Sequence, residues 1–292
     1  NTMPQWAGSS WYYLRYLDPK NVDALVSRED EQYWMNVDLY IGGTEHAVTH
    51  LLYSRFWHKI LFDLGVVSTD EPFQRMFHQG IVLGENGVKM SKSLGNVVNP
   101  DDFLKEYGAD TVRTYYMFLG PFEAMKPWDS KGIVGVYRFL SRVWRLVAQD
   151  DGTPDLSRLA PAGTPMSREL ERTLHQTIHK VSEDLEALRF NTAVSALMIL
   201  LNAMEDEART GLAREAVLTL VQLLSPFAPH LADEMWSRLG QSGSVYGSPW
   251  PQYDASKAIE ETVTLIFQVN GKLRDKLEVP RGLSKEQLEE FA

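Results

Sequence analysis

Residues 38–64 read DLYIGGTEHAVTHLLYSRFWHKILFDL, and they decide the fold of the first part of the chain. The apolar run at 38–43 ends in a glycine turn and predicts a short buried strand. Residues 45–64 predict a helix, because apolar side chains recur near helical spacing at Ala47, Leu51, Leu52, Phe56, Ile60 and Leu64. A second strand is predicted at 76–83, followed by the tight-turn residues Glu85-Asn86-Gly87. The order strand, helix, strand is typical of an α/β layer with a parallel sheet.

The pattern changes at Asn99, and most of the remaining chain predicts helices. Asn99-Pro100 is an N-cap residue followed by proline at the first helical position. Helices are predicted at 101–107, 110–118 and 132–148 and, beyond a proline-rich segment at 149–165, at 167–188, 191–208, 213–224 and 229–239. The last four are amphipathic with short connections, which predicts a bundle. Strands at 262–269 and 272–279 flank Asn270-Gly271 and predict a hairpin, and a further helix is expected to start at Ser284.

The composition is that of an ordinary globular chain, with 44% hydrophobic and 23% charged residues among 292. At about 150 residues per domain, this length predicts two domains and leaves room for a small third piece. The absence of cysteine excludes disulfides and thiolate metal sites and fits a reducing cytosol. No apolar run reaches the roughly 18–20 residues of a membrane span.

The net charge of −10 argues against nucleic-acid binding by overall charge, but not against a local basic path. The sequence begins at Asn1 and shows no signal-peptide pattern. We therefore expect this chain to be a piece of a longer protein.

The segment with the most specific functional indication is Lys89-Met90-Ser91-Lys92-Ser93. Two lysines supply mobile positive charges, and two serines with the loop amides supply neutral donors, which suits binding of a polyphosphate. A reaction that expels pyrophosphate needs such groups, because negative charge builds on the leaving group in the transition state. The alternative is an exposed basic loop without a ligand.

This pentapeptide resembles the KMSKS signature of the class I aminoacyl-tRNA synthetases. Four further segments resemble the bacterial-type leucyl-tRNA synthetases, namely Trp6–Tyr13, Tyr40–Ala47, Tyr107–Arg113 and Gln268–Lys272. The resemblance covers the chain from end to end and implies an α/β part followed by an all-α part. The implied domains are the second half of a Rossmann-like catalytic domain at 1–98, a helical connector at 99–150, a linker at 151–164, an anticodon-binding helical bundle at 165–255 and the start of a small C-terminal domain at 256–292.

The resemblance implies a leucine–tRNA ligase, which activates leucine with ATP to leucyl-adenylate and transfers it to tRNA(Leu). It implies ATP with Mg²⁺, the partners leucine and tRNA(Leu), and a cytoplasmic monomer without membrane attachment. The family's HIGH signature and editing domain are absent from this sequence, so we expect the chain alone to be inactive. Two alternatives stay open: a non-catalytic tRNA- or protein-binding module derived from a synthetase, and a class I synthetase for valine, isoleucine or methionine.

The resemblance also implies site residues. The catalytic residues would be Lys89 and Lys92, and the ATP site would comprise Lys89, Met90, Ser91, Lys92, Ser93, Gly42, Gly43 and Glu45. The leucine pocket would be lined by Tyr40, His46, His50 and Ser9, whereas Trp11, Tyr12 and Tyr13 are expected to pack. Contacts to tRNA would come from Arg138, Arg142, Arg145, Lys272, Arg274 and Lys276, for which the alternative is a solvated surface.

His46 and His50 allow two other interpretations. Two histidines four residues apart on a helix can ligate zinc, but the glutamate of that motif follows the first histidine, whereas Glu45 precedes it. No third ligand is evident, so we expect no metal bound by the protein itself. The two histidines could also be purely structural.

Overall fold

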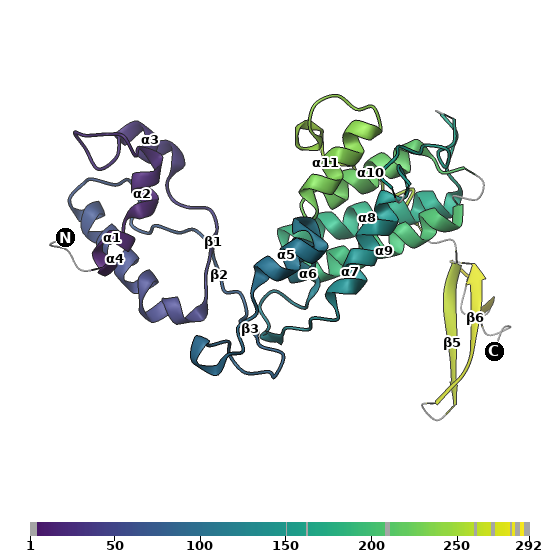
Figure 1. The fold of residues 1–292 in the computed structure, drawn as a ribbon, viewed down its shortest axis with the longest axis horizontal. Coiled ribbons are helices and arrows are strands. Elements are labelled where there is room, and N and C mark those ends of the chain that lie inside the picture. Colours follow the sequence, from purple (N-terminus) through teal and green to yellow (C-terminus); the bar gives the residue numbers. More distant parts are fainter. Residues whose placement is uncertain are drawn as a thin grey trace. The chain divides into compact units, whose positions relative to one another are not determined.

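The computed structural model describes residues 5–149, 151–161, 163–207, 211–259, 262–269, 272–280, 282–283 and 287–288. The chain forms two compact units (Figure 1). The first unit comprises Asn1–Val98 and Phe122–Trp128, and the second comprises Asn99–Pro121 and Asp129–Ala292. The chain therefore enters the second unit at Asn99 and returns to the first for seven residues.

The first unit is built from short elements. Its helices are α1 (Gln5–Ser9), α2 (Tyr12–Leu17), α3 (Arg28–Trp34) and α4 (His50–Asp63), with the 3₁₀ turns η1 (Thr44–Val48) and η2 (Lys92–Leu94). Its strands are β1 (Tyr40–Ile41), β2 (Met76–Phe77), β3 (Val82–Leu83) and β4 (Lys126–Pro127). Tyr13, Leu14 and Val67 form a buried centre, on which partly buried residues such as Leu61 and Phe73 pack.

The predicted strand–helix–strand order is confirmed in this unit. β1 and β2 pair in parallel, with Tyr40 beside Met76 and Ile41 beside Phe77. α4 lies between the two strands along the chain, as a parallel connection requires.

The predicted helix at 45–64 is wrong in its first turn. Residues 44–48 form the 3₁₀ turn η1, and the regular helix α4 begins only at His50. Thr49 interrupts the two with φ −123° and ψ −99°. Its amide donates to the carbonyl of His46 and its hydroxyl to that of Glu45, at 3.2 and 3.1 Å. Such local threonine bonds compete with the regular helical pattern.

The predicted strand at 76–83 is also wrong, because it is two strands with different partners. β2 pairs with β1, whereas β3 pairs in parallel with β4. Gly80 lies between them and donates its amide to the carbonyl of Phe122 at 2.8 Å. A Cβ at this position would collide with the carbonyl of Ala124. Glycine thus lets the returning segment approach, and the strand is divided there.

The second unit is mainly helical. Its helices are α5 (Pro100–Tyr107), α6 (Ala109–Phe118), α7 (Ile133–Trp144), α8 (Arg168–Glu186), α9 (Phe190–Glu207), α10 (Arg214–Leu224) and α11 (Pro229–Arg238), with the 3₁₀ turn η3 (Val245–Gly247). The predicted cap is confirmed, because the Asn99 side chain accepts from the amide of Asp101. α7 ends at Trp144, before the predicted end at 148, and the chain continues in turns that bury Leu146 and Val147.

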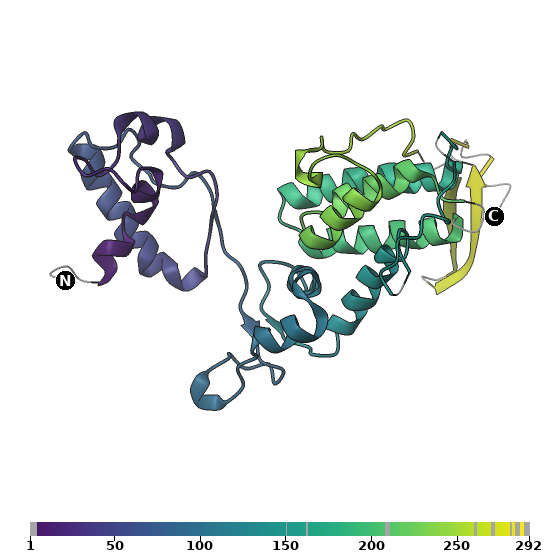
Figure 2. The same ribbon diagram turned by 45° about the horizontal axis from the view of Figure 1, so that its top comes forward.

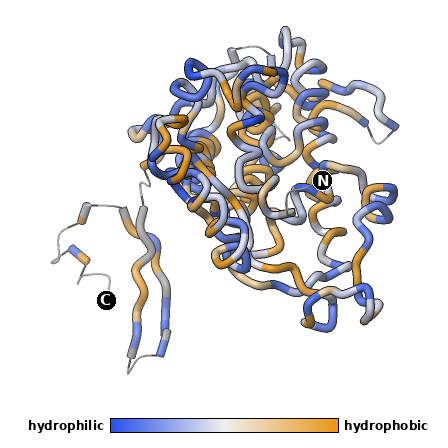
Figure 3. Tube along the Cα trace, turned by 90° about the vertical axis from the view of Figure 1, so that its left-hand side faces the viewer, coloured by the Kyte–Doolittle hydropathy of each residue, from blue (hydrophilic) through white to orange (hydrophobic). Residues whose placement is uncertain are grey.

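The four predicted bundle helices are present as α8–α11, which Figure 2 shows packed side by side. Leu197 and Leu201 of α9 and Leu220 of α10 are fully buried, as is Phe227 in the turn between α10 and α11. Along the helices hydrophobic and hydrophilic segments alternate (Figure 3), as expected of amphipathic helices.

The predicted hairpin is confirmed as β5 (Thr262–Val269) and β6 (Lys272–Pro280), which pair antiparallel. Its turn residues Asn270-Gly271 and the helix start expected at Ser284 lie outside the described residues. Among the described residues, no helix has both the length and the apolar character that a membrane crossing requires.

Candidate functional site

The lysine loop, defined here as residues 84–96, is carried on a tight turn. The amide of Gly84 donates to the carbonyl of Val88 at 2.9 Å, and Leu83 and Lys89 form an antiparallel bridge. Gly87 has a φ of +72°, a left-handed conformation that favours glycine. The turn predicted at 85–87 is therefore confirmed.

The tip of the loop presents its polar groups outward. Lys89, Lys92 and Ser93 are exposed, and the Ser91 and Ser93 hydroxyl oxygens lie 2.8 Å apart. Lys92 opens the 3₁₀ turn η2, which ends at Gly95 in a left-handed conformation. Two exposed ammonium groups beside paired hydroxyls can meet a polyphosphate by charge and by hydrogen bonds together.

A second group, the ring cluster, consists of Tyr12, Tyr40, His46 and His50. The Tyr12 and Tyr40 hydroxyl oxygens lie 3.0 Å apart. The His50 ring centroid lies 5.9 Å from that of Tyr12, 5.7 Å from that of Tyr40 and 6.3 Å from that of His46. The structure therefore brings three of the four predicted leucine-pocket residues together. It adds Tyr12, which the sequence analysis assigned to packing alone.

Two members of the ring cluster, His50 and Tyr40, have shifted pKa values. Burial lowers the pKa of His50, and the neighbouring His46 lowers it further. Burial raises the pKa of the Tyr40 phenol, as does its hydrogen bond with Tyr12. Both groups therefore favour their neutral forms, which suits a pocket for an apolar side chain.

The glycine turn between β1 and η1 holds the predicted nucleotide-binding residues. Gly42 donates its amide to the carbonyl of Phe77 at 3.1 Å, and the Nδ1 atom of His78 lies 3.1 Å from the Gly42 carbonyl oxygen. A Cβ at Gly43 would collide with the carboxylate of Glu45, which folds back over this position. Gly43 therefore leaves room for an exposed carboxylate directly after the strand.

Ser9 is half-buried at the end of α1, and its hydroxyl donates to the carbonyl of Trp6 at 3.1 Å. Trp6 stacks on Tyr53 of α4, with ring centroids 6.1 Å apart. The Ser9 hydroxyl is thus used within its own helix, whereas the other three predicted pocket residues contact one another.

The three arginines predicted to contact tRNA differ in their surroundings. Arg138 is exposed on α7. Arg142 forms an ion pair with Glu205 of α9, its Nε lying 3.0 Å from a carboxylate oxygen, and it also donates to Asn202 at 2.7 Å. Arg145 follows α7 and lines a cavity of about 850 Å³. Arg142 is therefore used to hold α7 on α9.

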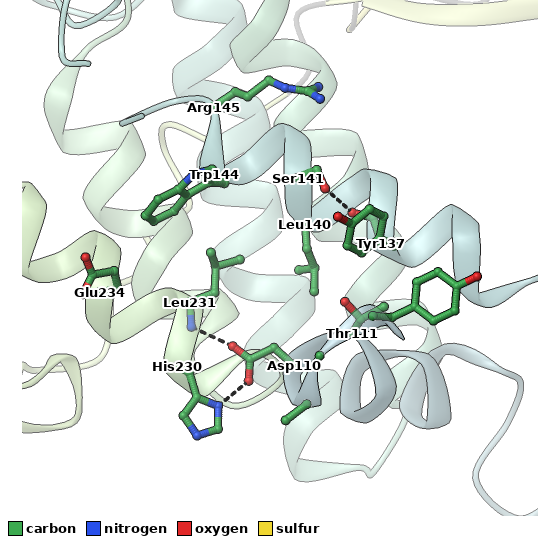
Figure 4. Close-up of a pocket in the computed structure, with 13 residues that line it drawn as sticks. Asp110, Thr111, Tyr137, Leu140, Ser141, Trp144, Arg145, His230, Leu231 and Glu234 are labelled. Atoms are coloured by element: carbon green, nitrogen blue, oxygen red, sulfur yellow. Dashed lines mark hydrogen bonds and ion pairs between the residues drawn. The ribbon is translucent and has the colours of Figure 1, made fainter. Parts of the chain in front are cut away.

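The cavity lies among α6, α7 and α11 (Figure 4). The carboxylate of Asp110 accepts from the backbone amide of Leu231 at 2.6 Å, and its other oxygen lies 2.8 Å from Nδ1 of His230. Trp144 forms another part of the wall, with the Arg238 guanidinium 4.5 Å from its ring centroid. The Asp110 carboxylate at this cavity joins α6 to α11, whereas the lysines of the loop are exposed to solvent.

The basic residues of the hairpin are only partly described. Lys272 and Arg274 are exposed on β6, and the side chain of Lys276 lies outside the described residues. Lys272 and Arg274 are two residues apart on one strand, which places them on the same face.

Sequence reasoning missed three contacts. Tyr12 is one of several tyrosines in a row, and His78 lies 36 residues from its partner Gly42, so local pattern does not mark either. Asn96 accepts from the amide of Ser91 at 2.8 Å. Its place directly after Gly95 was a usable signal, because asparagine side chains commonly bond to nearby backbone in loops.

Two family models match this chain. The model described as tRNA synthetases class I (I, L, M and V) matches residues 28–126, and the model described as anticodon-binding domain of tRNA ligase matches residues 167–289. Both parts of the chain therefore match models of tRNA synthetases, and the model that matches the first part is that of class I.

Three relatives with high sequence identity are leucine--tRNA ligases. Those of Chlorobaculum parvum and Chlorobaculum tepidum are 56% and 55% identical over 293 and 292 residues, covering 100% of this chain and 35% of each relative. The ligase of Chloroherpeton thalassium is 53% identical over 99% of this chain. The chain thus spans about 35% of the length of the relatives that it matches.

Solved structures agree with this assignment. A ternary LeuRS-tRNA-LeuAMS complex from Agrobacterium radiobacter K84 has a TM-score of 0.83 at 35% identity, covering 99% of this chain and 38% of that chain. A methionyl-tRNA synthetase of Mycobacterium tuberculosis, at 21% identity and a TM-score of 0.62 over 81% of this chain and 50% of that chain, shares the fold. The expected order of a catalytic-domain part followed by an anticodon-binding domain is confirmed.

Proposed function

We propose that this chain is part of a leucine–tRNA ligase and supplies its lysine loop, its leucine pocket and its tRNA-binding helices. The observation that carries the proposal is the exposed loop with Lys89 and Lys92, in a chain 56% identical over its whole length to a leucine--tRNA ligase. Because the chain spans about 35% of that relative, we assign the activity to a polypeptide of the relative's length.

In the proposed activation step, a leucine carboxylate oxygen attacks the α-phosphorus of ATP. The bond from this phosphorus to the bridging oxygen breaks, so leucyl-adenylate forms and pyrophosphate leaves. The ammonium groups of Lys89 and Lys92 stabilise the negative charge that builds on the leaving pyrophosphate, and the hydroxyls of Ser91 and Ser93 donate to it. No enzyme nucleophile is needed, so catalysis consists of positioning and charge stabilisation.

The ring cluster suits the leucine side chain, because His50 and Tyr40 favour their neutral forms and offer ring faces. The exposed carboxylate of Glu45 can accept hydrogen bonds from ribose hydroxyls. Gly42 and Gly43 keep the backbone beside it without side chains, which permits close approach of a nucleoside.

Mg²⁺ belongs to this proposal as the ion that ATP carries. Within the described residues, no group of three or more histidine, aspartate or glutamate side chains could hold a metal ion. We therefore assign the ion to phosphate oxygens and water, which it prefers, and name no residue of this chain as its ligand.

For tRNA(Leu), we propose phosphate contacts through the exposed Arg138, together with Arg145, Lys272 and Arg274. Arginine presents a planar fork that matches phosphate oxygens, and such contacts fix the register of a protein on nucleic acid. We assign Arg142 a structural part instead, because Glu205 and Asn202 occupy its guanidinium. A cytoplasmic monomer remains our expectation for the whole protein.

Lys92→Ala in an enzyme of the relatives' full length that contains this chain tests the proposal. We expect leucyl-adenylate formation in a single turnover to slow by roughly a hundredfold or more, as for the loss of one oxyanion contact. Lys105→Ala, which removes an exposed lysine of α5, is the matched control. Valine, isoleucine and methionine serve as competing substrates. A normal rate for Lys92→Ala, or preferred activation of another amino acid, would contradict the proposal.

A further inference from the structure

Asn96 joins the two ends of the lysine loop's tip. Its Oδ1 accepts from the amide of Ser91 at 2.8 Å, and its Nδ2 donates to the carbonyl of Lys89 at 3.3 Å. A third, longer contact of 3.5 Å runs from Nδ2 to the carbonyl of Val88. The Asn96 side chain thus contacts the backbone on both sides of Met90. It connects the start of the tip, at Lys89 and Ser91, to the end of the tip, at Asn96.

A carboxamide meets both requirements at this place. It offers an acceptor and donors on one short side chain, whereas a carboxylate offers acceptors alone. Aspartate would retain the bond from Ser91 but would set a negative charge against the Lys89 and Val88 carbonyls. Alanine would remove all three contacts.

The turn leaves space for this carboxamide. Gly84 is buried, and a Cβ there would lie 3.0 Å from Nδ2 of Asn96, 3.1 Å from Oδ1 of Asn86 and 3.2 Å from the carbonyl oxygen of Asn96. These separations are tighter than ordinary van der Waals contact, so an alanine at 84 would press on the side chains of both Asn96 and Asn86. Gly84 and Asn96 therefore fit each other across the base of the loop.

We propose that Asn96 is a positioning residue, which fixes the backbone of the lysine loop so that Lys92 is held ready to meet the leaving pyrophosphate. This inference rests on the proposed function of the loop. Lys92 directly follows Ser91, whose amide Asn96 holds, and Gly95 directly precedes Asn96. The segment that contains Lys92 is therefore held at both ends by the side chain and backbone of Asn96. Preorganisation of this kind lowers the cost of reaching the reactive geometry.

Asn96→Ala in the enzyme of the relatives' full length tests the role. We expect kcat for adenylate formation to fall about tenfold or more, with the leucine KM unchanged, because the loop and not the leucine pocket is altered. Asn96→Asp is expected to lower kcat as well. Asn99→Ala is the matched control, because Asn99 caps α5 through the amide of Asp101 and has no part in the loop.

A double-mutant cycle separates positioning from a general structural effect. If Asn96 acts through Lys92, the variant carrying both Asn96→Ala and Lys92→Ala will be less impaired than the product of the two single effects. Gly84→Ala disturbs the same carboxamide from the other side, and we expect it to lower kcat in the same direction. It also provides the test if Asn96→Ala does not fold.

The outcomes are distinguishable. Wild-type kcat in Asn96→Asp and Gly84→Ala, or a fully multiplicative double mutant, overturns the role of Asn96. A slow Lys92→Ala together with an unaffected Asn96→Ala overturns this inference alone. A normal rate for Lys92→Ala overturns the proposed function, and with it the inference.

Discussion

The phenol of Tyr12 on α2 lies 3.0 Å from the phenol of Tyr40 on β1, a hydrogen bond between residues 28 positions apart. The bond joins the aromatic segment near the start of the chain to the parallel strand pair. It also fixes two of the rings that surround His50. Tyr12 therefore links the folding of the first unit to the shape of the ring cluster.

Tyr12→Phe is expected to lower the free energy of unfolding by about 1 kcal/mol, because it removes one hydroxyl and leaves its partner unpaired. Urea denaturation of the chain provides the measurement. Tyr16→Phe is the control, since Tyr16 is 75% exposed and should change stability by less than about 0.5 kcal/mol. Equal effects of the two substitutions would show that the bond to Tyr40 contributes nothing.

His50→Ala in an enzyme of the relatives' length is expected to raise the KM for leucine more than the KM for ATP. The reason is that His50 lies against Tyr12 and Tyr40 of the proposed leucine pocket and takes no part in the hydrogen bonds of the lysine loop. Steady-state kinetics of amino-acid activation measure both constants. His179→Ala, on an exposed part of α8, is the control. An unchanged leucine KM in a folded variant would return His50 to a structural role.

We expect the ion pairs of Glu71 to contribute to the free energy of unfolding in a way that depends on pH. Hydrogen bonds from Arg55 are the main cause that lowers the pKa of Glu71 from 4.5 to about 2, with help from Lys59. A folded pKa below the unfolded one means that this contribution is complete above about pH 4.5 and is lost as pH falls toward 2. The groups are partly exposed, so we expect no more than about 1 kcal/mol, and less at high salt.

Glu71→Gln should therefore flatten the dependence of unfolding free energy on pH between about 4.5 and 2. Urea denaturation at several pH values in this window measures the slope. Glu29→Gln, on the first turn of α3, serves as a carboxylate control. The same slope in Glu71→Gln and in the unsubstituted chain would rule out this ion pair as its source.

Arg138 and Arg142 lie four residues apart on α7, and we expect their substitutions to affect different properties. Arg142→Ala removes the partner of Glu205 and is expected to lower the free energy of unfolding by about 1 kcal/mol. Arg138→Ala should leave stability unchanged but weaken tRNA binding and reduce its dependence on salt by about one phosphate contact. Filter binding at several salt concentrations, with thermal unfolding, measures both. Unaltered tRNA affinity of Arg138→Ala would exclude its phosphate contact.

Local patterns predicted the second unit best. The Asn99-Pro100 start and the helical spacing of apolar residues each depend on a few neighbouring positions, and the cap and the seven helices predicted between 101 and 239 are present. The lysine loop and its turn were equally visible, because glycine and asparagine mark such turns directly.

The first unit was harder because its details depend on distant partners. The strand at 76–83 divides because Gly80 meets the segment near Ala124, more than forty residues later. The interruption of the helix at Thr49 depends on whether the Thr49 hydroxyl donates a hydrogen bond to the nearby carbonyl of Glu45. The place of Tyr12 in the ring cluster likewise follows from tertiary contact with Tyr40. Periodicity alone does not contain this information.

The return of Phe122–Trp128 to the first unit determines where a truncation can be made. A protein expressed only to Val98 would lack β4, so the backbone of Val82 and Leu83 would lose its parallel partner. It would also lose the stacking of Phe122 on Phe77, whose ring centroids lie 5.4 Å apart. The practical domain boundary for expression or fusion therefore follows Trp128, and the two helices α5 and α6 must be carried along or replaced by a linker.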